Sequence, residues 1–295
     1  MNSEQKVTIH PNYEPEMVVN EHCGCGENPL YDAASGTLYW CDIGNGSIWA
    51  LDVSSGAHRL IYRGAECGAF TLQSDGNLLL LPGHDALILD VKSGETTPVK
   101  SEIVSDTGRF NDCIVDPKGR IFAGTVDWEQ QIRGALFGLG LSLEPTQICS
   151  GTACSNGMAW TPDGRGLFWA DSTAKTIYLF DHEAQSGALS NRKVWLHTPD
   201  STPDGLTIDI EGNLWITQFG DGCVRQYDVQ AQLVRQVDLP AANVTSCIFG
   251  GPDFGDLYIT TAAQSAKNDP LGGALFRIRP EIGGKDEFRS RVGIS

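Results

Sequence analysis

The chain has 295 residues, of which 41% are hydrophobic, so a sizeable core is available and a disordered chain is excluded. It carries 37 acidic against 21 basic residues, a formal net charge of −16, which argues against nucleic acid and an anionic membrane as partners, because both attract clustered Lys and Arg. The first residues lack the apolar stretch of a signal peptide, and the longest aliphatic run, Leu78–Leu81, is far shorter than a membrane span. The nine cysteines are an odd number in no disulfide-scaffold pattern, so we expect reduced thiols and a cytoplasmic location.

A turn that ends in glycine and leads into an aromatic or aliphatic strand recurs from residues 31–40 to residues 252–259. The turn glycines are Gly36, Gly76, Gly119, Gly164, Gly212 and Gly255. They are separated by 40, 43, 45, 48 and 43 residues, so the repeat covers essentially the whole chain. Glycine permits positive φ, and the Asp and Asn side chains before it close such turns locally.

Further strands follow most of these turns, for example at residues 47–52 and 176–181, and no stretch has an apolar period typical of a long helix. Three or four short strands in each repeat of 40–48 residues are typical of a propeller blade. The sequence therefore predicts an all-β, six-bladed β-propeller that forms a single domain over residues 1–295.

The repeat also aligns a set of polar residues before each turn. Eight positions before the turn glycine, or nine in the first repeat, the chain has Glu27, Gly68, Asn111, Asn156, Asp204 and Cys247. Equivalent positions in successive blades form a ring about the propeller axis, so these side chains should meet at the mouth of the central channel.

Carboxylate and amide oxygens on this ring could hold a cation. Glu27, Asn156 and Asp204 offer three oxygen donors, and a bound cation would offset the cost of desolvating two carboxylates together. Ligand type favours Ca²⁺, Mg²⁺ or Mn²⁺. The alternative is that Asn and Asp here only cap turns.

Arg109 lies two residues before Asn111, at the same predicted mouth. Its planar guanidinium could orient a carbonyl or hydroxyl of a substrate. The alternative is a structural salt bridge in an acid-rich chain.

These motifs, taken together, resemble the senescence-marker-protein/gluconolactonase family, to which regucalcin belongs. The matching segments are Cys23-Gly-Cys-Gly-Glu27-Asn-Pro29, Arg109-Phe-Asn-Asp112, Asp116-Pro-Lys-Gly119, Phe122-Ala-Gly-Thr125, Ser155-Asn-Gly157, Pro203-Asp-Gly205 and Thr245-Ser-Cys-Ile-Phe-Gly-Gly251. The chain departs from the family at Asn28, where Gly or Ser is usual, at Tyr31, where Trp is common, and in a shorter segment over residues 262–273.

The resemblance implies a metal-dependent sugar lactonase, which hydrolyses an aldonolactone to the aldonic acid. It implies metal ligation by Glu27, Asn156 and Asp204, and substrate contacts from Arg109, Asn111 and Glu129. Family members are reported to use Zn²⁺ or Fe²⁺ besides the harder ions. We expect Asp204 to act also as the general base for the attacking water.

Two other functions compete with this interpretation. One is a calcium-binding regulatory propeller with little catalysis, because a fold alone does not determine function. The other is a paraoxonase-like ester hydrolase, although no paired histidines indicate a base for it.

Overall fold

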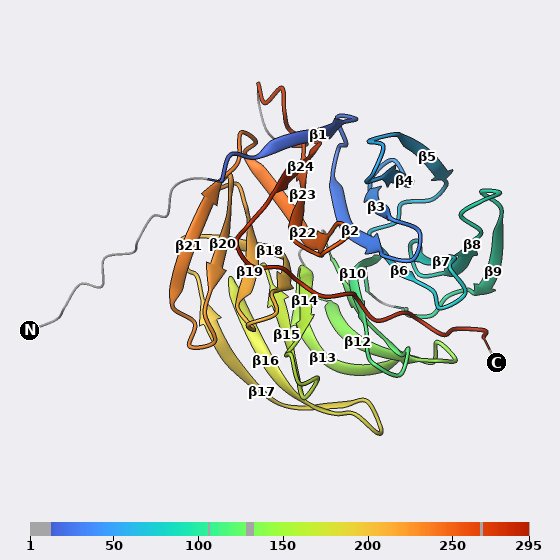
Figure 1. Ribbon diagram of the computed structural model, residues 1–295. Helices are drawn as coiled ribbons and strands as arrows, with labels where there is room; N and C mark the ends of the chain where they lie inside the picture. The colour runs from blue at the N-terminus through green and yellow to red at the C-terminus, as the bar shows by residue number, and fades with distance from the viewer. Residues whose placement is uncertain (1–12, 106, 128–132, 266–267, 295) are drawn as a thin grey trace, which may run out of the picture.

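The computed structural model describes residues 13–105, 107–127, 133–265 and 268–294. Within them the regular structure is antiparallel β-sheet, as predicted, and the sheets are arranged around a centre in a propeller-like fold (Figure 1). No helix in these ranges is long and apolar enough to cross a membrane.

Four of the sheets have four strands each and follow one another along the chain. The first two contain β2 (Gly26–Asp32), β3 (Thr37–Asp42), β4 (Ser47–Asp52) and β5 (His58–Arg63), then β6 (Ala69–Leu72), β7 (Leu78–Leu81), β8 (Ala86–Leu89) and β9 (Thr96–Lys100). The next two contain β10 (Phe110–Val115), β11 (Ile121–Thr125), β12 (Gly134–Gly140) and β13 (Thr146–Thr152), then β14 (Ser155–Trp160), β15 (Gly166–Asp171), β16 (Thr176–Glu183) and β17 (Ala188–His197).

The remaining strands form one eight-stranded sheet. It contains β18 (Thr202–Ile208), β19 (Leu214–Phe219), β20 (Cys223–Tyr227), β21 (Leu233–Asp238), β22 (Asn243–Gly250), β23 (Asp256–Ala262), β24 (Ala274–Ile278) and β1 (Glu16–Asn20). The N-terminal strand β1 pairs with the last strand, β24.

The prediction of six separate blades was therefore wrong: the structure has four four-stranded blades and one eight-stranded sheet. The two halves of the large sheet are joined where Phe219 of β19 pairs with Asn243 of β22. Turn spacing predicts hairpins, but it does not predict whether neighbouring strands of successive repeats exchange hydrogen bonds.

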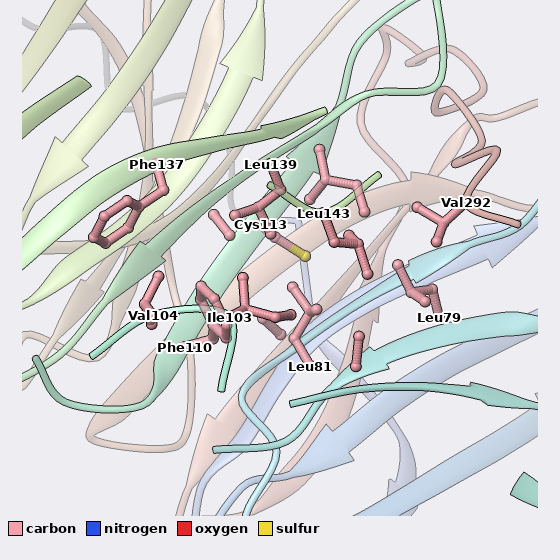
Figure 2. Close-up of a cluster of buried hydrophobic side chains, with 14 of the residues drawn as sticks. Leu79, Leu81, Ile103, Val104, Phe110, Cys113, Phe137, Leu139, Leu143 and Val292 are labelled. Carbon is pink, nitrogen blue, oxygen red and sulfur yellow. The ribbon is translucent and has the colours of Figure 1, made fainter. Parts of the chain in front are cut away.

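Apolar side chains between successive sheets form the core. Figure 2 shows one such cluster, in which Leu79 and Leu81 of β7 face Phe110 and Cys113 of β10. Three of the largest fully buried side chains are the tryptophans Trp40, Trp169 and Trp215. This packing holds the sheets in place around the centre because burial of such side chains is the main favourable contribution to folding.

The first strand of each repeat is innermost. β2, β6, β10, β14, β18 and β22 contact one another in that cyclic order, and β22 returns to β2. Nearly every residue of these strands is buried. Polar side chains at the beginnings of these strands therefore converge from distant parts of the chain.

Candidate functional site

Four residues of the predicted ring line one cavity of about 360 Å³: Glu27, Asn111, Asn156 and Asp204. They lie near the beginnings of β2, β10, β14 and β18. The structure therefore brings together these four residues, as predicted from their spacing.

A local irregularity in each of these four strands accompanies the four residues. The pairing register shifts between Glu27 and Leu30, between Phe110 and Asp112, between Ser155 and Met158, and between Pro203 and Leu206. A β-bulge places an extra residue on one strand and redirects its side chain. The functional side chains are thus presented from bulges in otherwise regular, buried strands.

Asn28 holds the carboxylate of Glu27. The backbone N–H of Asn28 donates to Glu27 Oε2 at 2.8 Å, and its side-chain amide donates to the carbonyl of Phe70 at 3.0 Å. Asn28 has a φ of 47°, a left-handed conformation that Asn tolerates better than most residues. This departure from the usual Gly or Ser thus still permits the required backbone turn.

Asn156 and Asp204 are also in direct contact. Asn156 Nδ2 donates to Asp204 Oδ1 and to Ser172 Oγ, the latter at 3.2 Å. Asn156 Oδ1 is buried and has no hydrogen-bond partner among the described residues. An unpaired buried carbonyl oxygen is costly, and a cation is one partner that would satisfy it.

The raised pKa values of the two carboxylates, Glu27 and Asp204, also indicate a site for a cation. Burial, with Asp204 and Asp112 nearby, raises the pKa of Glu27 well above its ordinary value. Burial and Asp112 likewise raise the pKa of Asp204, against the hydrogen bond from Asn156. A bound cation would stabilise both charged forms, so two carboxylates and one amide oxygen fit a hard divalent ion.

The described residues contain no group of three or more His, Cys, Asp or Glu side chains placed to hold a metal. A metal here would therefore depend on the amide oxygen of Asn156 together with Glu27 and Asp204, with water completing its shell.

Arg109 reaches the same cavity and is held by three hydrogen bonds. Its Nε donates to Glu66 Oε1 at 2.8 Å, and its Nη1 donates to Asn111 Oδ1 at 2.8 Å and to the Phe110 carbonyl at 3.0 Å. Nη2 donates to none of the described residues, so its two N–H groups remain for a ligand.

Gly68 was predicted to belong to the ring, and its lack of a side chain explains its place there. A Cβ at Gly68 would lie 2.7 Å from Arg109 Nη1 and 2.9 Å from the carbonyl oxygen of Asn111. Glycine therefore leaves the room that the guanidinium occupies.

One residue of the predicted ring, Cys247, lies away from the cavity. Cys247 is buried, its thiol donates to the Trp215 carbonyl at 3.6 Å, and it does not line the cavity. Glu129 lies outside the described residues.

Sequence reasoning missed several residues of the cavity wall. These include Cys25, Glu66, Cys154 and Ser172, with apolar Ile43 and Phe219 beside them. Burial raises the pKa of the Cys154 thiol to about 12, so this thiol is protonated at neutral pH. Cys25 and Cys154 lie two residues before predicted ligands, and that proximity was the available signal; no motif marks Glu66.

A family model described as the SMP-30/gluconolactonase/LRE-like region matches residues 25–263. This match confirms the resemblance inferred from the motifs. It spans every residue of the cavity except Gln264.

Characterised relatives match over nearly their full length. The chain is 34% identical over 288 residues to a pentonolactonase of Haloferax volcanii, covering 93% of this chain and 97% of that protein. It is 31% identical over 280 residues to human regucalcin, covering 91% and 92% of the two chains. Among solved structures, a calcium-binding protein, regucalcin from Agrobacterium tumefaciens, has a TM-score of 0.89 at 23% identity, with 95% and 98% covered.

Proposed function

Because this chain belongs to the SMP-30/gluconolactonase/LRE-like family, we propose that it hydrolyses a sugar lactone with one divalent metal ion held by Glu27, Asn156 and Asp204. One observation supports this most strongly: two carboxylates, an unpaired amide oxygen and a free guanidinium edge share one cavity. The pentonolactonase relative supports a lactone of an aldonic acid as substrate.

The cavity accommodates a small polar ring. Its volume of about 360 Å³ is at the lower end of the range for small-molecule sites. Phe219 and Ile43 provide an apolar wall, while Thr173, Thr202 and Gln264 offer hydrogen bonds to hydroxyl groups. Arg109 Nη2 is the donor that we assign to the oxygen on which negative charge develops.

A divalent ion at Glu27, Asn156 and Asp204 would polarise the lactone carbonyl and acidify a nearby water. The ion is one of Ca²⁺, Mg²⁺, Mn²⁺, Zn²⁺ or Fe²⁺. Two carboxylates with an amide oxygen favour the harder ions.

Asp204 is our candidate general base. Its Oδ1 accepts the hydrogen bond from Asn156, whereas no described residue donates to Oδ2. We assign Oδ2 to take the proton from the water whose oxygen attacks the lactone carbonyl carbon. The ester bond to the ring oxygen then breaks, the ring oxygen gains a proton, and the aldonic acid results.

The test is acid release from a panel of five- and six-membered aldonolactones, after chelation and after addition of each divalent ion. We expect turnover that at least one ion stimulates and chelation abolishes. The absence of turnover on every aldonolactone would overturn the proposal.

A second function is a calcium-binding regulatory protein, favoured by a structural relative described as a calcium-binding protein. The free Nη2 of Arg109 weighs against it, because a structural ion does not need such a donor beside it. For the paraoxonase-like alternative, the described cavity wall contains no histidine to act as a base.

We also propose that the protein works in a reducing compartment such as the cytoplasm. All nine cysteines are free in the structure, and seven of them are buried.

A further inference from the structure

Arg109 is the only cationic side chain on the described wall of the cavity, and its charge is already paired. Glu66 Oε1 lies 2.8 Å from Arg109 Nε. The guanidinium side chain is 12% exposed and the Glu66 side chain is 52% exposed. The arginine is therefore enclosed, while the carboxylate lies at the opening of the cavity.

The peptide group between Glu66 and Cys67 is anchored through both its carbonyl and its N–H. Its carbonyl accepts from Gly83 N at 3.1 Å, and the next residue, Cys67, donates its N–H to the Ile43 carbonyl at 3.4 Å. A fixed backbone means that the carboxylate stays near the opening, whichever rotamer it adopts.

We infer that Glu66 is both a positioning residue for Arg109 and a charge selector, which restricts the site to lactones that carry no carboxylate or phosphate. The inference rests on the proposed lactonase function and specifies its substrate class. Glu66 orients the planar guanidinium so that Nη2 remains free for the uncharged ester oxygen.

Charge selection follows from the composition of the wall. In the proposed site Glu27 and Asp204 offset the charge of the divalent ion and Glu66 offsets that of Arg109, so an anionic group on the substrate would meet no uncompensated positive charge. A carboxylate approaching through the opening would also be repelled by Glu66. The same repulsion would speed the departure of the aldonate product.

The test compares the γ-lactones of D-gluconic and D-glucaric acid, which differ in a terminal hydroxymethyl or carboxylate group. We expect the wild-type protein to favour the gluconic lactone in kcat/KM by about 100-fold or more. Glu66→Gln keeps an oxygen acceptor for Arg109 Nε but removes the charge. It should raise kcat/KM for the glucaric lactone relative to that for the gluconic lactone at least about tenfold, mainly through KM.

Three further measurements separate selection from a general structural effect. The increase in kcat/KM for the glucaric lactone that Glu66→Gln causes should become smaller as salt rises, because the Glu66 carboxylate is half-exposed and its charge is screened. Binding of D-glucarate, measured by calorimetry at low salt, should tighten about tenfold in the same variant. Glu66→Ala should also lower kcat on both lactones, since Arg109 loses its orienting partner.

Glu95→Gln is the matched control, because it removes the same charge at an exposed turn outside the cavity wall. The ratio of kcat/KM for the two lactones should not change in this variant. An unchanged ratio in a folded Glu66→Gln variant would overturn the inference while the lactonase function stands. If that variant does not fold, the wild-type protein alone tests the inference. Equal kcat/KM for the two lactones, or a ratio of these kcat/KM values that does not decrease as salt rises, then overturns it. No turnover of either lactone by the wild-type protein overturns the inference, and no turnover on the whole aldonolactone panel overturns the lactonase function as well.

Discussion

The side-chain amide of Asn156 donates to Asp204, and its carbonyl oxygen Oδ1 is left buried without a partner among the described residues. One hydrogen bond thus fixes the orientation of both side chains. The amide nitrogen is turned toward the carboxylate, so the amide oxygen must point elsewhere. In the proposed site it is the third ligand, and this orientation leaves Asp204 Oδ2 free to act as a base.

Asp204→Asn should lower kcat by about 100-fold or more even at saturating metal, because it removes the proposed base while retaining an oxygen ligand. Steady-state kinetics over a metal titration measures this. Glu27→Gln is the control: its loss of activity should be restored by excess metal. Full rescue of Asp204→Asn by metal would limit Asp204 to a ligand role.

Gly68→Ala should lower kcat/KM by about tenfold or more, because the new methyl group would displace Arg109 and the Asn111 backbone. Gly44→Ala, on the cavity wall, is the control, since a Cβ there meets nothing within 4 Å. Kinetics of both variants, with thermal melting to confirm folding, tests whether Arg109 packs directly against Gly68. Equal activity of the two variants would contradict it.

The chelated protein should lose stability as the pH rises from about 4 to 7. Burial raises the pKa of Asp112 to about 7, above its ordinary value, so the folded state binds more protons than the unfolded state in this window. Deprotonation therefore destabilises the fold, by roughly 4 kcal/mol for a shift of about three pKa units. Urea unfolding at several pH values measures it.

A divalent ion should add stability to the chelated protein at neutral pH, since it stabilises the charged carboxylates of Glu27 and Asp204, whose pKa values are also raised. A chelated protein whose stability rises over the same window would contradict the argument.

Asp209→Ala should destabilise the protein by about 3 kcal/mol or more, because several donors lose their buried acceptor. The Asp209 carboxylate accepts from Asn213 N at 2.9 Å, Trp215 Nε1 at 3.1 Å and Gln226 Nε2 at 2.9 Å. Denaturant unfolding of the variant gives the value.

Asp228→Ala is the control in the same sheet. Among the described residues, the Asp228 carboxylate accepts only from the backbone N–H groups of Gln230 and Gln232, at a turn near the surface, so its loss should cost about 1 kcal/mol or less. Similar costs for the two variants would show that burial of the Asp209 network contributes little.

The repeat in the sequence predicted most of the strand positions, because a hairpin turn has strong local requirements. Gly36, Gly76, Gly119, Gly164 and Gly212 all have positive φ, as expected for turn glycines. The last repeat differs, since Phe254, with a φ of 53°, takes the left-handed conformation beside Gly255. The pairing of Phe219 with Asn243 is a contact between repeats, so local turn chemistry does not determine it.

The candidate site was predicted in part for the same reason. Nearly equal distances from the turns predicted that Glu27, Asn111, Asn156 and Asp204 lie together, and in the structure they line one cavity. The bulges that aim these side chains leave no pattern in one sequence. Glu66 was missed because its role depends on meeting Arg109, 43 residues later in the chain.

The contact of β2 with β22, and the pairing of β1 with β24, have a consequence for synthesis on the ribosome. Asp204 lies 177 residues after Glu27, so the first of these carboxylates emerges long before the second. The ring then stays open until β24 emerges and pairs with β1. The inner strands of a nascent chain therefore cannot complete their ring until late in translation, and the proposed metal site would be among the last features to form.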